Sequence, residues 1–348
     1  MIDQKYIISQ DKSLLEALSQ INYIATGPLC LFVVDNKGKM VGTLTDGDSR
    51  RALIKGASIN DSISLVMNRD FNCLHKGVDD DVIHIHHQRD LKMKLVPVLD
   101  KNDQIIDIID LERIITRLPV DVVLMAGGKG ERLRPLTLTT PKPLLQVGGK
   151  SIIDYNVERL ISYGISHINV TVNYLHEQIE EHFSKEIKGT IVKCVREPQF
   201  LGTIGSVKLV KEFHHDIILL MNSDLFTNVN YEDFFTHFMR HDADMSVATI
   251  PYTVNVPYGI FELDGRNIKA IKEKPSYNYY ANAGIYLLKK DLLEYIPNDS
   301  FFNTTDLIEK LISLGKSVIR FPITGYWIDI GRLEDYKKAQ ELVHHLQS

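Results

Sequence analysis

Cysteine is scarce in this sequence of 348 residues. Cys30, Cys73 and Cys194 lie far apart, are odd in number and never form a C-x-x-C pair. That spacing argues against a disulfide framework or a cysteine zinc site, and it fits a reducing compartment. The first residues lack the apolar core of a signal peptide, and no apolar run approaches the length of a membrane span. We therefore expect a cytoplasmic protein with no membrane partner.

An excess of basic charge is also missing. The formal net charge is −5, and 24% of the residues are charged while 44% are hydrophobic. A chain with no basic field or stripe is poorly suited to bind the phosphate backbone of a nucleic acid, so we expect no nucleic-acid partner. Composition and length are typical of a globular protein with two domains.

The first third of the chain contains an internal repeat. Segments 31–48 and 96–113 each have two apolar runs around a polar turn, with Asp35 and Asp100 in equivalent positions. A helix-like segment precedes each of them. The pattern predicts a β-hairpin followed by a helix, twice. Residues 1–118 are therefore expected to form two similar α/β units that pack together.

From Pro119 onward, predicted strands and helices alternate, so we place a domain boundary there and assign 119–348 to a second domain. Strands joined by helices at this spacing predict a mostly parallel sheet covered on both faces, with ligands at the carboxyl ends of the strands. The expected strands are 120–126, 167–173, 190–197 and 216–224, and the expected helices are 151–164, 175–183, 203–213, 304–314 and 332–346.

A glycine-rich segment, MAGGKGERLRP (125–135), follows the first of these strands directly. Its glycines allow a tight backbone path whose N–H groups can converge on phosphate oxygens. Arg132 stands where its fork of donors can brace a triphosphate. The segment fits neither the dinucleotide-binding nor the Walker pattern, and taken by itself it is better explained as a plain tight turn.

A second segment, TTPKPLLQVGGKSIID (139–154), places Lys142 between two prolines. The prolines hold the backbone extended and limit its freedom. A lysine held in this way suits a phosphate contact, although a lone lysine in a loop is more often a solvated surface residue.

Together, these two segments resemble the signature of the sugar-phosphate nucleotidyltransferase family, G-x-G-x-R-L-x-P followed by P-K-P. The resemblance continues in order along the chain and covers roughly 120–337. The further matching segments are EPQFLGTIGSV (197–207), MNSDLF (221–226), PYGIFEL (257–263), KEKP (272–275), NAGIYLL (282–288) and WIDIGRLEDY (327–336).

The resemblance implies a Rossmann-like (GT-A-like) α/β domain that joins an NTP to a sugar 1-phosphate and releases pyrophosphate. Such chemistry needs cations more than acids or bases, because negative charge crowds the phosphates. Mg²⁺ would be the cofactor. The carried-over residues are Arg132, Lys142 and Asp224 for catalysis; Asp224 and Asp329 for the metal; Ala126, Gly127, Gly128, Gly130, Glu131, Glu197, Gly202 and Thr203 for the nucleotide; and Gly259, Glu273, Lys274 and Asn282 for the sugar phosphate.

Two positions depart from the family pattern. Glu131 stands where many members have threonine, and this difference is expected to alter how the loop is held around the triphosphate. Ser223 replaces the glycine of N-G-D, a change between small residues that we expect to be tolerated. Taken singly, Asp224 and Asp329 would read as turn or cap residues, and only the ordered series of motifs favours the metal role.

The repeats in residues 1–118 resemble a pair of CBS modules, a family that binds adenosine-type ligands. GTLTDGD (42–48) resembles the ribose–phosphate segment of that family, which points to Thr45 and Asp48 as contacts for a regulatory nucleotide. The equivalent pattern in the second repeat is broken. A module that only dimerises remains an equal alternative, and paired CBS modules imply a homo-oligomer, a dimer or higher.

Within the enzyme hypothesis, the CBS fusion favours GTP with an amino-sugar or heptose 1-phosphate, as in nucleotide-sugar biosynthesis for surface glycans. The alternatives are a dTTP- or UTP-dependent enzyme, a catalytically inactive regulatory homologue, and a cytidylyltransferase acting on phosphocholine. Retention of Arg132, Lys142, Asp224 and Asp329 argues against the inactive homologue. The E-K-P and N-A-G segments favour a sugar substrate.

Histidines at 84, 86 and 87 do not share one helix face, so we expect a solvated surface rather than a metal site. Trp327 and the tyrosines of YNYYAN (277–282) are expected to shape the sugar pocket or the core.

Overall fold

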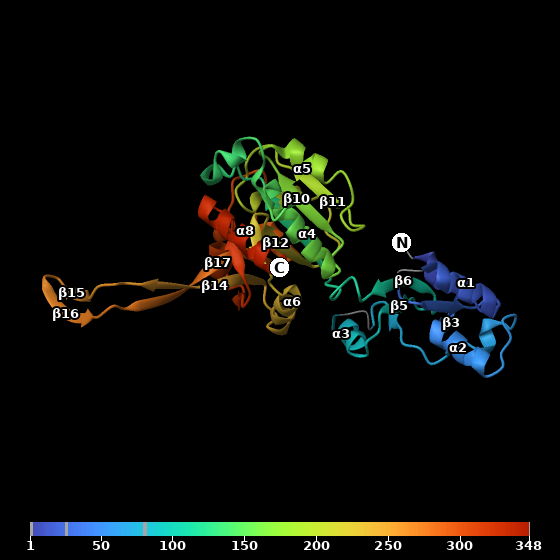
Figure 1. Cartoon of the computed structure of the whole chain (residues 1–348). Helices are drawn as coiled ribbons and strands as arrows, with labels where there is room; N and C mark the ends of the chain where they lie inside the picture. Colours follow the sequence, from blue (N-terminus) through green and yellow to red (C-terminus); the bar gives the residue numbers. More distant parts are fainter. Residues whose placement is uncertain (1–2, 25–26, 79–81, 348) are drawn as a thin grey trace. The chain divides into compact units, whose positions relative to one another are not determined.

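The computed structural model describes residues 3–24, 27–78 and 82–347. The chain divides into two compact units (Figure 1). The amino-terminal unit comprises Met1–Leu118 with Ser162–Gly164, and the carboxy-terminal unit comprises Pro119–Ile161 with Ile165–Ser348. Across the described ranges, no helix combines the length and the apolar character that a membrane crossing requires.

The amino-terminal unit contains the two repeats that the sequence predicts. Each repeat forms a three-stranded sheet whose middle strand is parallel to the first strand and antiparallel to the third. The first repeat consists of β1 (Ile7–Ser9), α1 (Leu14–Ile24), β2 (Cys30–Val34), β3 (Met40–Thr45) and α2 (Asp46–Ile54), and the second of β4 (Leu74–His75), α3 (Val82–Asp90), β5 (Leu95–Leu99) and β6 (Ile105–Asp110).

The two hairpin turns are built in the same way. Asp35 Oδ1 accepts the backbone N–H groups of Lys37 and Lys39 at 2.8 and 2.9 Å. Asp100 makes the same two bonds, at the same two distances, with the residues two and four positions on. An aspartate that accepts hydrogen bonds from the backbone just after it stabilises a turn locally. The alignment of Asp35 with Asp100 in the sequence therefore correctly identified two equivalent turns.

The helix expected after the second hairpin does not form. In the first repeat, Thr45 caps α2. After β6, the carbonyl of Asp110 instead accepts the N–H groups of Arg113 and Ile114, which makes turns. Only eight residues separate Asp110 from Pro119, which is short for a stable helix. The residue before a proline also disfavours helical backbone, so a helix could not continue to the end of this segment.

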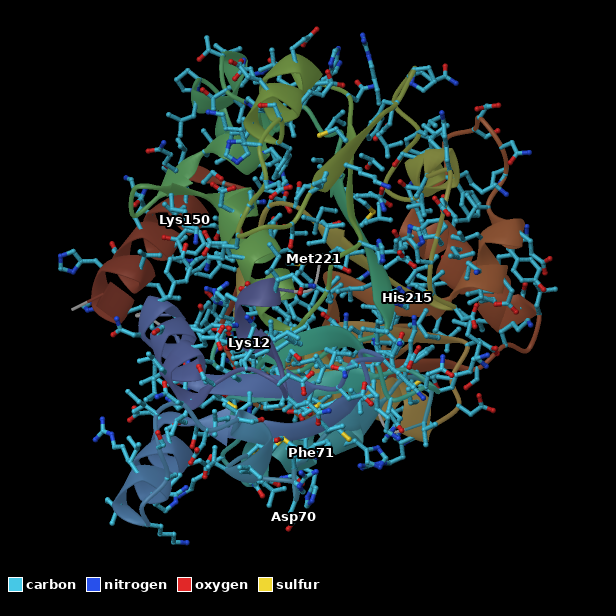
Figure 2. All side chains as sticks on the ribbon, turned by 90° about the vertical axis from the view of Figure 1, so that its right-hand side faces the viewer. Lys12, Asp70, Phe71, Lys150, His215 and Met221 are labelled. Carbon is cyan, nitrogen blue, oxygen red and sulfur yellow. The ribbon has the colours of Figure 1, made fainter. Side chains whose placement is uncertain are left out.

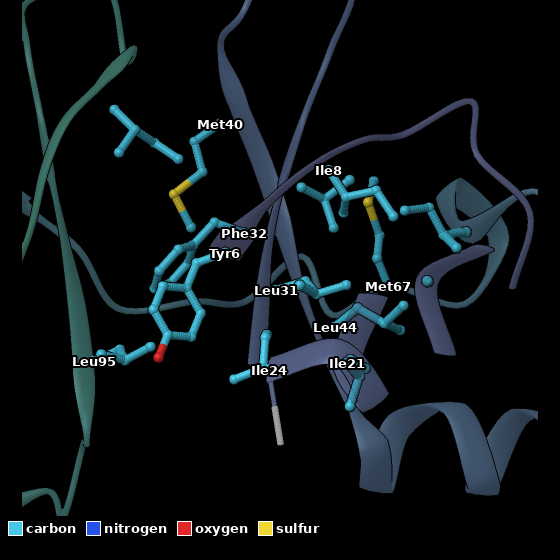
Figure 3. Packing of buried hydrophobic residues seen from close by; sticks show 14 of the residues in the cluster. Tyr6, Ile8, Ile21, Ile24, Leu31, Phe32, Met40, Leu44, Met67 and Leu95 are labelled. Atoms are coloured by element: carbon cyan, nitrogen blue, oxygen red, sulfur yellow. The ribbon is translucent and has the colours of Figure 1, made fainter. Parts of the chain in front are cut away.

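The repeats pack on one another, as the sequence predicts. Leu95, Leu99 and Ile105 of the second repeat join the hydrophobic cluster of the first. Figure 3 shows Leu95 next to Tyr6 in this cluster. A backbone bond from Met40 to the Asp103 carbonyl, 2.9 Å long, ties the two hairpins at their turns.

A seven-stranded sheet forms the centre of the carboxy-terminal unit, in the order β11-β10-β7-β12-β17-β14-β18. The first four strands are mutually parallel, and β17 runs antiparallel to both β12 and β14. Met221 of β12 lies in the interior of this unit (Figure 2). The strands are β7 (Val120–Ala126), β10 (Ile168–Val172), β11 (Val192–Arg196), β12 (Ile217–Asn222), β14 (Met245–Asn255), β17 (Ser276–Lys289) and β18 (Val318–Pro322).

Five α-helices are described in the carboxy-terminal unit. One of them, α6, lies in a stretch for which the sequence predicts no helix. Asn230 caps it by accepting the N–H groups of Glu232 and Asp233, and its phenylalanines are buried. The helices are α4 (Ile152–Ser162), α5 (His176–His182), α6 (Tyr231–Arg240), α7 (Thr304–Ser313) and α8 (Leu333–Gln347).

The α-helix expected over 203–213 is wrong. The segment forms a short 3-10 helix, Gly205–Leu209, followed by irregular backbone. The N–H groups of Ile204 and Gly205, at the beginning of the segment, donate to the carbonyl of Phe302 at 3.1 and 3.2 Å. These hydrogen bonds link the segment to a part of the chain that is distant in the sequence. Tertiary packing therefore decides the backbone here over local helical pattern.

Beyond the sheet, β14 and β17 continue as a two-stranded ribbon that ends in a second hairpin, β15 (Ile260–Asp264) and β16 (Asn267–Lys272). Figure 1 shows this ribbon extending away from the rest of its unit. We call residues 251–281 the arm; none of them is buried. Tyr279 and Tyr280 are more than half exposed on it, so the expectation that they line a pocket or the core is wrong for these two residues.

Candidate active site

A cavity of about 390 Å³ opens at the carboxyl ends of the parallel neighbours β7 and β12, where a parallel sheet is expected to bind ligands. We call it the central cavity. It brings together most of the residues that the family resemblance implies for catalysis and nucleotide binding: Ala126, Gly127, Gly128, Gly130, Glu131, Arg132, Lys142, Glu197, Gly202, Thr203 and Asp224.

The glycine-rich loop forms one wall of the central cavity. Gly130 has a left-handed backbone (φ +61°) and starts a 3-10 helix over Glu131–Leu133 that carries Arg132. Its carbonyl accepts the Thr137 hydroxyl at 2.8 Å. A Cβ at Gly127 would stand 2.5 Å from Glu197 Oε1, so any larger residue would displace this buried carboxyl group.

Lys142 lies at the floor of the cavity with only 9% of its surface exposed. Its ammonium group contacts Asp224 Oδ2 and stands 3.7 Å from Asp329 Oδ1. The two aspartates are 105 positions apart in the sequence. They meet because β13 (Leu225–Thr227) pairs antiparallel with β19 (Trp327–Asp329), with Leu225 opposite Asp329.

The electrostatics of this pair favour a bound cation. Burial, with a further contribution from the negative charge of Asp224, raises the pKa of Asp329, and the nearby Lys142 and Arg132 offset only part of that rise. Asp224 Oδ1 is buried and has no hydrogen-bond partner among the described residues. A buried carboxylate oxygen without a partner is costly unless a donor or a metal ion satisfies it.

The donor set therefore fits a divalent cation such as Mg²⁺, which takes one or two carboxylates and completes its shell with water and phosphate oxygens. Over the described ranges, no group of three or more histidine, cysteine or acidic residues forms a complete protein-only metal site. A metal held here would depend on the substrate phosphates for the rest of its ligands.

Glu197, beside the glycine-rich loop, and the segment after it form a second wall of the central cavity. The Glu197 side chain is buried, and Oε2 accepts the Leu201 N–H at 3.3 Å; burial raises the pKa of this carboxyl group. Thr203 is held by α7, because its hydroxyl oxygen accepts the Thr304 N–H at 2.8 Å. Phe200 lines the cavity while half exposed, and its ring meets Phe301 edge to face.

Several lining residues were not singled out from the sequence. Each of them lies in the same motif as a residue that the sequence analysis did name. Their position in these motifs is therefore the signal that could have identified them. They are Met125, Pro143, Phe200, Ser206, Asn222 and Gly331. Ser223, which replaces the glycine of N-G-D, donates its hydroxyl to the Met125 carbonyl at 2.8 Å and ties β12 to β7.

Three residues expected at the sugar phosphate are not at the cavity of their own chain. Gly259, Glu273 and Lys274 lie on the arm, and none of them lines the central cavity. Asn282 lies at the root of the arm, where its side chain donates to the Tyr286 hydroxyl and accepts the Gly284 N–H, both at 2.9 Å. Within one chain, the structure does not assemble the expected sugar site.

Thr45 and Asp48 bond each other. The Thr45 hydroxyl donates to Asp48 Oδ2 at 2.6 Å and accepts the Asp48 N–H at 3.1 Å, which caps α2. A second cavity, of about 470 Å³, is lined by Asp48, Arg51 and Lys55 but not by Thr45. The helical histidines at 84, 86 and 87 are exposed.

Comparison with known proteins gives named relatives for the carboxy-terminal unit. It is 30% identical over 230 residues to the bifunctional protein GlmU of Methanocaldococcus jannaschii, which covers 64% of this chain and 54% of the relative. It is 28% identical over 229 residues to the D-glycero-alpha-D-manno-heptose 1-phosphate guanylyltransferase of Aneurinibacillus thermoaerophilus, covering 65% of this chain and 99% of that enzyme. This chain spans only about 54–62% of the length of several of its curated relatives.

Among solved structures, HddC from Yersinia pseudotuberculosis superposes with a TM-score of 0.52 at 28% identity, over 64% of this chain and 99% of that one. Its complex with GMP-PN gives a TM-score of 0.51 at 26% identity. The fold is therefore that of the sugar nucleotidyltransferases, with a mostly parallel sheet.

Two families match the chain. The CBS domain family matches residues 1–55, which correspond to the first repeat alone. The nucleotidyl transferase family matches residues 121–345, well over half of the chain and nearly the whole carboxy-terminal unit. This chain is a member of the nucleotidyl transferase family that carries a CBS domain at its amino-terminal end.

Proposed function

We propose that this chain transfers a nucleotidyl group from an NTP to a sugar 1-phosphate, giving a nucleotide diphosphate sugar and pyrophosphate. The observation that carries the proposal is the Lys142–Asp224–Asp329 cluster at the central cavity, which a glycine-rich loop also lines. It combines a buried cation, a pair of carboxylates and a backbone cradle, which is what a crowded set of phosphates requires.

In the proposed reaction, a phosphate oxygen of the sugar 1-phosphate attacks the α-phosphorus in line. The bond from the α-phosphorus to the bridging oxygen breaks, and pyrophosphate leaves. Arg132 and Lys142 hold the phosphates and neutralise charge that builds on them. Asp224 and Asp329 would hold Mg²⁺, which supplies Lewis-acid neutralisation of phosphate oxygens. Little acid–base work is left for the protein.

As substrates we propose GTP and an amino-sugar or heptose 1-phosphate, for nucleotide-sugar biosynthesis in the cytoplasm. Support comes from the names of relatives, which include a heptose 1-phosphate guanylyltransferase and a mannose-1-phosphate guanylyltransferase catalytic subunit. A dTTP- or UTP-dependent enzyme is the alternative. An inactive regulatory homologue is disfavoured, because Arg132, Lys142 and Asp224 all line one cavity.

For the amino-terminal unit we propose a regulatory role through a nucleotide bound beside Asp48. The match to the CBS family and the cavity lined by Asp48, Arg51 and Lys55 support it. Arg51 and Lys55 would supply positive charge for a phosphate, beside the carboxylates of Asp48 and Asp61 that line the same cavity. Thr45 bonds Asp48 instead of facing the cavity, so the nucleotide would meet Asp48 without it.

The test is pyrophosphate release across a matrix of GTP, UTP, dTTP, CTP and ATP against mannose, heptose, glucose and amino-sugar 1-phosphates, with Mg²⁺ present. The proposal expects one dominant combination that contains GTP. Dominance of UTP or dTTP would replace the proposed base, and a blank matrix with folded protein would favour the regulatory homologue.

A further inference from the structure

One polar residue stands on the buried face of α4. Asn156 is only 2% exposed, and the other buried residues of this helix are all apolar. Asparagine is a modest helix former, and a buried amide group costs free energy unless it is hydrogen-bonded. A leucine would suit both the helix and the surrounding core better, so the amide at this position calls for a reason.

The amide group of Asn156 bonds to the turn that carries Asp224. Its Nδ2 donates to the carbonyl of Leu225 at 2.9 Å and to the carbonyl of Ser223 at 3.3 Å. A third contact, 3.4 Å to the carbonyl of Ile152, stays within α4. One side chain of the helix therefore holds the backbone on both sides of Asp224.

Asp224 lies between two strands, where the backbone changes direction. β12 ends at Asn222 and β13 begins at Leu225, and the two residues between them form a turn. The carbonyl of Asp224 itself accepts the Ile330 N–H at 3.2 Å. The carbonyls of Asp224 and of its two neighbours are thus all hydrogen-bonded, and two of the three accept from Asn156.

The conformation of this turn matters because the two carboxylate oxygens of Asp224 have different surroundings. Oδ2 contacts the ammonium group of Lys142, whereas Oδ1 is buried and has no hydrogen-bond partner among the described residues. An aspartate side chain is short, so a shift of the backbone at this residue moves both oxygens. Holding the backbone therefore also holds the oxygen that is left for a cation.

We infer that Asn156 is a positioning residue for the metal site. By holding the carbonyls on both sides of Asp224, it fixes the carboxylate of that residue and sets the affinity of the site for Mg²⁺. The inference rests on the metal role in the proposed function. Asn156 itself does not line the central cavity. Loss of a group that orients a metal ligand from behind typically weakens metal binding by about 10–100-fold.

The same helix offers a matched control residue. Arg159 donates from Nη2 to the carbonyls of Asn228 and Val229, at 2.8 and 2.7 Å, and from Nε to Val229 at 3.2 Å. These carbonyls follow Asp224 by four and five positions, beyond the end of β13. Arg159→Met should therefore loosen the link between α4 and this stretch of chain without moving Asp224.

The first experiment measures metal binding and needs no turnover. Mn²⁺ is titrated into the full chain with an equimolar non-hydrolysable GTP analogue, free Mn²⁺ is followed by electron paramagnetic resonance, and a titration of the analogue alone is subtracted. In Asn156→Leu we expect the dissociation constant for Mn²⁺ to rise by about 10-fold or more. Asn156→Ala, which removes the amide without adding bulk, is the second variant and should show the same rise. Arg159→Met should stay within about twofold of wild type.

Thermal unfolding of the same proteins separates positioning from plain stabilisation. Variants of both residues should unfold at lower temperature than wild type, because each loses hydrogen bonds to buried or half-buried carbonyls. Unchanged Mn²⁺ affinity in the Asn156 variants would give this residue a structural role only. Equal weakening of Mn²⁺ binding in Arg159→Met would show a general loosening of α4. Either result would overturn the inference.

The second experiment follows turnover against Mg²⁺ concentration. In Asn156→Ala, the Mg²⁺ concentration for half-maximal turnover should rise by about 10-fold, and excess Mg²⁺ should restore most of the wild-type rate. A loss of rate with no shift in the Mg²⁺ midpoint would contradict the inference. If wild type turns over no substrate, the proposed reaction fails, while the Mn²⁺ titration still decides the role of Asn156. If wild type is active but binds Mn²⁺ no better than the Asn156 variants do, the inference fails and the proposed reaction stands.

Discussion

At the scale of single residues, the balance of charge around Lys142 decides what the central cavity can hold. One buried ammonium group faces two carboxylates, and one oxygen of Asp224 has no partner among the described residues. The cluster therefore contains an unsatisfied buried acceptor, which a divalent cation would satisfy.

Replacement of Asp224 tests that role. The change Asp224→Asn keeps the shape and removes the charge, so we expect turnover to fall by about 10²-fold or more while the thermal unfolding of the protein stays close to wild type. Asp216→Asn is the control, because that side chain is 95% exposed and lies outside the cavity. Near-normal turnover in the first variant would rule out the metal role.

Two neighbouring glycines give a matched pair for the packing of the phosphate loop. In Gly127→Ala, the new methyl group meets the buried Glu197 carboxyl at 2.5 Å, and we expect a loss of about 1–3 kcal/mol in the free energy of unfolding. In Gly128→Ala, no heavy atom lies within 4 Å of the new group, so stability should change by less than about 0.5 kcal/mol. Denaturant unfolding measures the stability of both variants. Equal losses in the free energy of unfolding would show that the loop or Glu197 shifts to accommodate the methyl group at Gly127.

At the scale of elements, an ion pair joins two helices on the parallel half of the sheet. His182 at the end of α5 lies 2.7 Å from Asp154 near the start of α4. The hydrogen bond to Asp154 raises the pKa of His182 above its ordinary 6.5, although burial opposes it. Burial would raise the pKa of Asp154, but the hydrogen bonds from His182 and Ser151 together hold it below 3.8.

The pair therefore stabilises the fold in a defined pH range. Folding favours protonated His182, so its contribution is complete below pH 6.5 and is lost as the pH rises through the higher pKa of the folded state; at the acid end it is lost as the pH falls through the lowered pKa of Asp154. We expect Asp154→Asn to cost about 1 kcal/mol at pH 6 and clearly less at pH 8.5. Urea unfolding at both pH values measures this, and an equal cost at both would disprove the charged pair.

At the scale of the whole molecule, two units with separate hydrophobic clusters should unfold separately. Trp327 is the only tryptophan in the sequence and lies in the carboxy-terminal unit, so its fluorescence reports that unit, whereas circular dichroism reports both. With GTP and Mg²⁺ at about 100 times the dissociation constant, the tryptophan transition should gain about 2.7 kcal/mol. A gain seen by circular dichroism without a shift in fluorescence would place the nucleotide in the amino-terminal unit instead.

The sequence by itself determined much about this protein. The glycine-rich loop, the lysine between two prolines and the aspartate at the end of a strand are all local patterns. Such patterns determine strands, turns and caps, because these depend on residue propensity and on hydrogen bonds within a few residues. The paired turns at Asp35 and Asp100, the parallel strands, and the cavity at their carboxyl ends were all predictable in this way.

Only the tertiary structure decided the rest, because it depends on residues far apart in the chain. Pairing of β13 with β19 brings Asp224 to Asp329, and a distant carbonyl, that of Phe302, replaces the expected helix after Thr203. No local pattern shows where a hairpin stands relative to a cavity. The sequence places the E-K-P segment in the sugar site. In the structure, Glu273 and Lys274 lie on the arm, away from the cavity of their own chain. The reason is the pairing of β14 with β17, because backbone hydrogen bonds along the ladder fix the direction of the ribbon.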